Sequence, residues 1–122
     1  MSLIAVIDDD EYIGDMLRRA LEGEGYQVAR AYSGTEALLL LEKTNPDLVL
    51  LDLMMPGLAG EEVLKRIQGI PVIVVSAKAD VENKVDLLLG GAADYVTKPF
   101  DIRELLARIA VQLRQAESTG AG

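Results

Sequence analysis

The stretch Leu48-Val49-Leu50-Leu51-Asp52-Leu53-Met54-Met55-Pro56-Gly57 decides the fold of this chain. Four consecutive apolar residues lead into a carboxylate, and a Pro-Gly pair follows almost at once. Such an apolar run is typical of a parallel strand that helices cover on both faces, and Pro56-Gly57 prevents the strand from continuing. We therefore place Asp52 at the carboxyl end of a buried strand, the edge at which open parallel α/β sheets bind ligands.

Composition limits the chemistry that the chain can perform. Its 122 residues are the size of one domain, and half of them are hydrophobic. Neither cysteine nor histidine occurs, which excludes disulfides, thiolate metal sites and catalysis by histidine. The net charge of -8 argues against direct binding to nucleic acid. Because the sequence has no apolar segment of membrane-spanning length and no signal peptide, we expect a soluble, cytoplasmic protein without membrane contacts.

Alternating apolar runs and helical patterns predict the architecture. Strands are expected at residues 3–7, 28–32, 48–51, 72–75 and 94–97, and a helix is expected after each of them. Asp10, the Ser33/Glu36 pair and the Asp101/Glu104 pair are expected to cap three of the helices. The pattern predicts an α/β fold, a doubly wound, flavodoxin-like parallel sheet of five strands in the order 2-1-3-4-5, flanked by five helices. The domain should cover residues 1–115, with residues 116–122 as a flexible tail or the start of a linker.

Polar side chains follow four of the predicted strands, and this strand order brings Asp8, Asp9, Asp52, Ser76 and Lys98 to one edge of the sheet. Three neighbouring carboxylates repel one another, so either one of them keeps a proton or a cation joins them. Hard oxygen ligands favour Mg²⁺, which binds carboxylates and a main-chain carbonyl and shares phosphate oxygens. Lys98 and Ser76 can hold phosphoryl oxygens, and an aspartate in such a site can become an acyl phosphate.

Over about residues 3–115, these motifs resemble the receiver domain of two-component response regulators. The resemblance implies that Asp52 accepts a phosphoryl group from the phosphohistidine of a sensor histidine kinase. It also implies that Asp8 and Asp9 form the acidic pair and bind Mg²⁺ together with Asp52 and the main-chain carbonyl of Met54. Slow hydrolysis of the acyl phosphate would reset this switch, and the resemblance implies no other enzymatic activity.

The same resemblance assigns the switch. It implies that Lys98, which precedes a usually cis Pro99, contacts the phosphoryl group. Ser76 and Tyr95 take the positions of the switch hydroxyl and the switch aromatic. A phosphoryl group is expected to draw the Ser76 hydroxyl inward and to let Tyr95 rotate into the space left behind. The face formed by the fourth helix, the fifth strand and the fifth helix would change shape as a result.

Residues of that face resemble the dimer contacts of the OmpR/PhoB class of winged-helix transcription regulators, which implies a homodimer on phosphorylation and a transcriptional output. Ala93 and Ala110 stand where that class commonly has a further acid and base, so one bridge is expected to be missing on each side. DNA would be bound only through an output domain outside this chain. The expected salt-bridge residues are Lys84, Asp94, Glu104 and Arg108, and the expected apolar patch is Val85, Leu88 and Ala107.

Four alternatives remain open from the sequence. A stand-alone receiver would act by docking a target protein on the same face. A haloacid-dehalogenase-like phosphohydrolase also uses an aspartyl nucleophile and Mg²⁺, but it needs a second carboxylate two residues later, where this chain has Met54. A nucleotide-binding flavodoxin-like protein would need a Gly-rich loop after the first strand, which is absent. A degenerate receiver could serve only as a scaffold, although every residue needed for phosphorylation is present.

Overall fold

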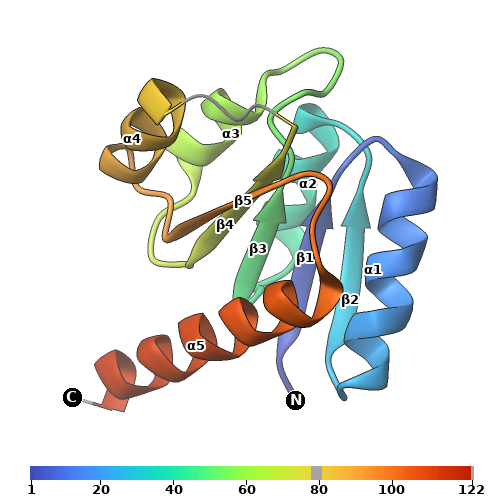
Figure 1. Ribbon diagram of the computed structural model, residues 1–122, viewed down its shortest axis with the longest axis vertical. Helices are drawn as coiled ribbons and strands as arrows, with labels where there is room; N and C mark the ends of the chain where they lie inside the picture. The colour runs from blue at the N-terminus through green and yellow to red at the C-terminus, as the bar shows by residue number, and fades with distance from the viewer. Residues whose placement is uncertain (78–80, 122) are drawn as a thin grey trace.

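The computed structural model describes residues 1–77 and 81–121, in which strands and helices alternate along the chain (Figure 1). The elements are β1 (Leu3–Ile7), α1 (Glu11–Gly23), β2 (Gln27–Ala31), α2 (Gly34–Lys43), β3 (Leu48–Leu51), α3 (Gly60–Arg66), β4 (Val72–Ser76), α4 (Val81–Leu89), β5 (Asp94–Thr97) and α5 (Ile102–Ala121).

The sheet confirms the predicted topology. Its five strands are all parallel and lie in the order β2-β1-β3-β4-β5. The central strand β3 pairs with β1 on one side, where Ile7 lies beside Leu51, and with β4 on the other, where Leu51 lies beside Val74. Every residue of β3 is buried, as its uninterrupted apolar run predicts for a strand covered on both faces.

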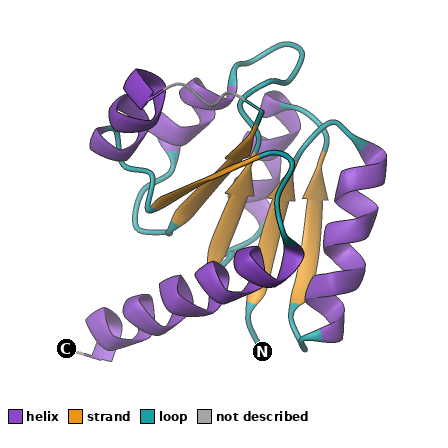
Figure 2. Ribbon diagram, in the orientation of Figure 1, coloured by secondary structure: helices purple, strands orange, loops and turns teal. Residues whose placement is uncertain are grey.

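Helices cover both faces of the sheet, as Figure 2 shows by the purple layers on either side of the orange strands. One core cluster joins the sheet to α1 and α5, through Leu17 and Leu21 of α1 and Leu105 and Ile109 of α5. The other joins it to α2, α3 and α4, and Leu87 of α4 is buried in this cluster. The strands are therefore held in a fixed register, and their carboxyl ends meet at the upper edge in Figure 1.

The predicted helix caps are present at α1 and α2. The Asp10 carboxylate accepts a hydrogen bond from the N–H of Ile13 at 3.1 Å, and the Ser33 hydroxyl accepts one from the N–H of Glu36 at 3.1 Å. The return bond of the second cap is displaced by one residue, because the Glu36 carboxylate accepts from the N–H of Tyr32. These caps fix where α1 and α2 leave the edge of the sheet.

The prediction of a complete capping box at the start of α5 was wrong. The Asp101 carboxylate accepts from the N–H of Arg103 at 2.8 Å, which is the forward half of a cap. The Glu104 carboxylate accepts instead from the guanidinium of Arg108, at 2.9 Å from Nη2, because Arg108 lies one turn further along the same helix.

Residues 116–121, which we expected to be a flexible tail or the start of a linker, belong to helix α5, which extends to Ala121. Ala116 and Glu117 favour helix, and no proline interrupts this part of the sequence. Among the described residues, neither α5 nor any other helix combines the length and the apolar character that crossing a membrane requires.

Candidate functional site

The carboxyl edge of the sheet holds the three buried polar residues of the described part of the chain, Asp8, Asp52 and Ser76. Asp8 follows β1 and is 3% exposed, Asp52 follows β3 and is 5% exposed, and Ser76 ends β4 and is fully buried. Each side chain is placed by its strand: the N–H of Asp52, for instance, donates to the carbonyl of Ile7 at 2.9 Å and extends the β3–β1 pairing by one residue. Burial of polar groups is costly unless they are paired, so partners are expected around them.

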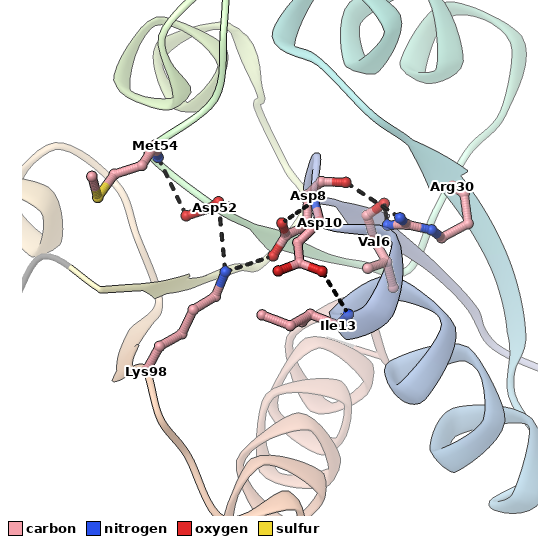
Figure 3. A network of polar contacts seen from close by, with 8 residues as sticks. All are labelled: Val6, Asp8, Asp10, Ile13, Arg30, Asp52, Met54 and Lys98. Atoms are coloured by element: carbon pink, nitrogen blue, oxygen red, sulfur yellow. Dashed lines mark hydrogen bonds and ion pairs between the residues drawn. The ribbon is translucent and has the colours of Figure 1, made fainter.

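Lys98 follows β5 and supplies the main partner of both buried carboxylates. Its Nζ lies 2.8 Å from Asp8 Oδ2 and 3.6 Å from Asp52 Oδ2, and Figure 3 shows the ammonium between the two. The Lys98–Pro99 peptide bond is cis, as the family resemblance implied. Lys98 thus bridges residues that are far apart in sequence but lie at the ends of neighbouring strands.

Asp8, Asp9 and Asp52 form a cluster in which one carboxylate oxygen from each residue lies within 4.8 Å of the others. Asp8 Oδ1 accepts from the N–H of Asp10 at 2.9 Å, and Asp52 Oδ1 accepts from the N–H of Met54 at 3.2 Å. When ionised, these three carboxylates carry three negative charges, and within residues 1–77 and 81–121 the Lys98 ammonium, which pairs with Asp8 and Asp52, offsets one of them. An oxygen-only donor set with this charge is suited to a hard divalent cation such as Mg²⁺.

The electrostatics of the pocket raise the pKa of both its acid, Asp52, and its base, Lys98. Burial, followed by repulsion from Asp8, raises the pKa of Asp52, although Lys98 and hydrogen bonds from Met54 and Ser76 partly oppose this. Burial by itself would lower the pKa of Lys98, but hydrogen bonds and charge from Asp8 and Asp52 outweigh it, so the pKa of Lys98 is raised. Lys98 therefore remains an ammonium, and a further cation would favour the ionised form of Asp52.

Arg30 of β2 belongs to this network, although nothing in the sequence analysis singled it out. Its Nη1 donates to the carbonyl of Val6 at 3.1 Å, and its Nη2 donates to the carbonyl of Asp8 at 3.3 Å (Figure 3). An arginine within an edge strand usually extends into solvent, so its position in the chain predicts no such role. The one available signal is Gly14 inside a helical pattern, because such a glycine often has a packing reason.

Of the two predicted switch residues, Ser76 ends β4 inside the pocket, whereas Tyr95 belongs to β5; the predicted dimer residues belong to α4, β5 and α5. Tyr95 is half-buried, and the Lys84 ammonium lies 5.4 Å from the centre of its ring. Arg108 pairs with Asp94 and with Glu104 of the same chain, each at 2.9 Å. The predicted apolar patch is accessible: Val85 and Leu88 of α4 are each 47% exposed, and Ala107 of α5 is exposed.

Comparisons with known proteins show the family of this chain. Residues 4–110 match the model of the response regulator receiver domain family. The chain is 43% identical over 121 residues to the "DNA-binding response regulator MtrA" of Mycolicibacterium paratuberculosis, covering 97% of this chain and 54% of the relative. It is 47% identical over 116 residues to the "Uncharacterized transcriptional regulatory protein YkoG" of Bacillus subtilis, covering 92% and 51%. It therefore spans about half the length of these relatives.

Among solved structures, the receiver domain protein (CheY-like) from Methanospirillum hungatei JF-1 is similar, with a TM-score of 0.93, 34% identity and coverage of 98% of both chains. The names of the relatives are consistent with the OmpR/PhoB resemblance seen in the sequence. The matched region contains the whole carboxylate pocket from Asp8 to Lys98. By family match, identity and fold together, this chain belongs to the response regulator receiver domain family.

Proposed function

We propose that this chain is a phosphoacceptor switch in which Asp52 receives a phosphoryl group from the phosphohistidine of a sensor histidine kinase. The observation that supports this best is the burial of Asp52 beside Asp8 and Lys98 at the end of the central strand. A carboxylate oxygen of Asp52 would attack the phosphorus, and the nitrogen–phosphorus bond would break with its electron pair going to the histidine nitrogen. With a proton on its other ring nitrogen, the phosphohistidine ring would leave as neutral imidazole. The product is an acyl phosphate on Asp52.

Lys98 is placed to stabilise the charge on the transferred group. Its ammonium has three N–H donors, and Asp8 holds the amine at 2.8 Å, which leaves donors for an oxygen on Asp52. The hydroxyl of Ser76, which lies within hydrogen-bonding reach of Asp52, can bind a second phosphoryl oxygen. Positioning and charge neutralisation of this kind are most of what phosphoryl transfer needs from a protein.

The donor set fits Mg²⁺, and Asp8, Asp9, Asp52 and the main-chain carbonyl of Met54 would hold it. When bound, the ion would neutralise the carboxylate cluster and the incoming phosphoryl oxygens. We propose that slow hydrolysis of the acyl phosphate resets the switch, with no other catalytic activity. The phosphohydrolase alternative is disfavoured because its second carboxylate is replaced by Met54, whose side chain is 56% exposed.

Output is proposed to pass through Ser76 and Tyr95 to the face of α4, β5 and α5. There, Lys84, Asp94, Glu104 and Arg108 with the apolar patch would form a phosphorylation-dependent homodimer. Because relatives of about twice this length are named as DNA-binding or transcriptional regulators, we propose a transcriptional output through a domain that lies outside this chain. We also propose a cytoplasmic location, where the kinase domain would be met. A stand-alone receiver that docks a target protein on this face is the second candidate.

The test is incubation with acetyl phosphate and Mg²⁺, followed by intact mass spectrometry of the native protein, Asp52→Ala and Asp10→Asn. The native protein should gain one phosphoryl group, and Asp52→Ala should gain none. Asp10→Asn is the matched control, because Asp10 lies beside the pocket but serves as a helix cap, and asparagine also caps helices. A phosphoryl gain that survives in Asp52→Ala would remove Asp52 from its proposed role.

A further inference from the structure

Arg30 is a second cation at the acidic edge, and it contacts the main chain of β1 rather than a carboxylate. Arg30 lies directly beside Val6 in the β1–β2 pairing. Its two terminal nitrogens reach the carbonyls of Val6 and Asp8, which are two residues apart and therefore point to the same side of the strand. The planar guanidinium suits this pair of acceptors because its donors have a fixed fork geometry.

Gly14 of α1 provides the space in which this guanidinium lies. A Cβ built on Gly14 would overlap Arg30 Nη2 and Cζ and would lie 2.7 Å from Nε. Glycine inside a helix is unfavourable relative to alanine, so its presence in the first part of α1 needs a packing reason. Arg30 is that reason, because any side chain at position 14 would displace the guanidinium.

The environment of Arg30 holds it in this one position. The ring of Tyr32 stacks against the guanidinium, with 4.4 Å between Cζ and the ring centre. Within the described part of the chain, Arg30 Nε is buried and has no hydrogen-bond partner. An arginine that leaves one donor unpaired while directing two others to carbonyl oxygens is held for those two contacts rather than for solubility.

The contact with Asp8 controls the geometry of the acidic pair. The carbonyl of Asp8 belongs to the planar peptide that joins Asp8 to Asp9, so fixing its direction also fixes the Cα of Asp9. Asp9 is exposed, and its carboxylate is therefore placed mainly by the backbone that carries it. The side chain of Asp8 is held separately by Asp10 and Lys98.

We infer that Arg30 is a positioning residue for the divalent cation: its guanidinium, seated over Gly14, holds the Asp8–Asp9 peptide so that both carboxylates converge with Asp52. This inference rests on the proposed Mg²⁺-dependent function. It adds an outer layer of the metal site that comes from β2 and α1, elements that supply none of the proposed ligands. Outer-layer contacts that orient metal ligands typically change metal affinity by about 10- to 100-fold when they are removed.

The experiment measures Mg²⁺ affinity by isothermal titration calorimetry for the native chain, Arg30→Met, Arg30→Lys, Gly14→Ala and the double variant Gly14→Ala/Arg30→Met. Arg30→Met should weaken Mg²⁺ binding about tenfold. The Mg²⁺ affinity of Arg30→Lys should lie between those of the native chain and Arg30→Met, because an ammonium is a point donor and cannot hold both carbonyls equally. Gly14→Ala should reproduce the loss of Mg²⁺ affinity without removing the charge of Arg30.

The double variant should bind Mg²⁺ no more weakly than Arg30→Met does, because both changes remove the same contact. Arg103→Met, at an exposed arginine that pairs with Asp101, is the control and should bind as the native chain does.

Urea unfolding and ¹H–¹⁵N spectra of the same variants separate positioning from mere packing. The amide resonances of Asp9 and Asp10 should shift in Arg30→Met before any Mg²⁺ is added. Lower stability with unchanged Mg²⁺ affinity in Arg30→Met and Gly14→Ala would overturn the inference and leave the proposed function intact. Failure of the native chain to bind Mg²⁺ would overturn both. If Arg30→Met does not fold, Arg30→Lys and Gly14→Ala decide the question by the same comparison.

Discussion

The Lys98 ammonium lies closer to Asp8 than to Asp52, with Nζ at 2.8 Å from Asp8 Oδ2 and at 3.6 Å from Asp52 Oδ2 (Figure 3). The lysine is therefore anchored by the acidic pair and stands beside the proposed phosphoacceptor without a short hydrogen bond to it. Such an arrangement keeps a positive charge available for an oxygen that arrives on Asp52.

Replacing Lys98 by methionine should remove the positive charge that would stabilise the phosphoryl oxygens arriving on Asp52. We expect at least a tenfold slower phosphorylation by acetyl phosphate, because one charge-directed contact in a transition state is worth about that factor or more. Stability should fall by about 1–3 kcal/mol, since Asp8 loses a charge-assisted hydrogen bond in a buried site. Both effects are measured by intact mass over time and by urea unfolding. Lys65→Met is the control: Lys65 pairs with Glu62 at the surface, and its loss should cost less than about 1 kcal/mol.

In the absence of divalent ions, Asp52 should make the free energy of unfolding fall as the pH rises. Its pKa is raised by burial and by Asp8, so the native state holds the proton over a pH range in which the unfolded chain has released it. Stability is therefore lost as pH rises from the ordinary value of 3.8 through the folded-state pKa of Asp52. Asp52→Asn should be the more stable protein at neutral pH, and this advantage should vanish below the ordinary value.

The check is urea unfolding of both proteins as a function of pH, with and without Mg²⁺. Added Mg²⁺ should stabilise the native protein more than Asp52→Asn, because binding to the folded state adds to its stability. Parallel pH profiles for the two proteins would contradict the assigned cause.

Gly60→Ala should disturb the backbone of the phosphoacceptor. A Cβ on Gly60 would lie 2.5 Å from the carbonyl oxygen of Asp52 and 2.6 Å from the Cα of Leu53, so α3 would have to move. We expect a loss of about 1–3 kcal/mol in unfolding free energy and slower phosphorylation. Gly23→Ala is the matched control, because a Cβ there meets nothing within 4 Å and alanine favours the helix by up to about 1 kcal/mol. Equal unfolding free energies for Gly60→Ala and Gly23→Ala would contradict this prediction, because α3 would then move away from the added methyl group without a loss of stability.

Ser76→Ala should separate phosphorylation from the change of the α4–β5–α5 face. The Ser76 hydroxyl lies within hydrogen-bonding reach of the Asp52 carboxylate, so we expect it to follow a phosphoryl group on that residue. We expect the variant to be phosphorylated, yet to show much smaller shifts than the native protein at Tyr95 and along α4 in ¹H–¹⁵N spectra. Full native shifts in the phosphorylated variant would count against the coupling.

Arg108→Ala should weaken the proposed dimer. In the single chain, Arg108 pairs with Asp94 and Glu104, so an intersubunit bridge would have to share or exchange these partners. We expect the beryllofluoride-loaded native protein to dimerise at high concentration, and Arg108→Ala to need about tenfold more protein, as for the loss of one hot-spot arginine. Sedimentation or light scattering gives the readout, and Arg103→Ala is the control from the same helix. A native protein that stays monomeric under these conditions would overturn the dimer.

The sequence predicts those features of this molecule that depend on residues close together in the chain. The run Leu48–Leu51 followed by Asp52 predicted a buried strand and a carboxylate at its end, because apolar periodicity and a Pro-Gly breaker act on neighbouring residues. The same logic at β1, β4 and β5 predicted the strand order and brought Asp8, Ser76 and Lys98 to one edge. The Asp10 cap was predictable for the same reason.

Only the tertiary structure decided the contacts of side chains that can reach several possible partners. Glu104 bonds to Arg108 rather than back to the start of its helix, and Arg108 pairs within its own chain. Arg30 turns inward because Gly14, on a different element, leaves room for it. The sequence by itself determined the elements, their order and the residues at the edge of the sheet, since these follow from local patterns. The partner of each charged side chain was decided by packing, because long side chains reach several acceptors and only the folded geometry selects among them.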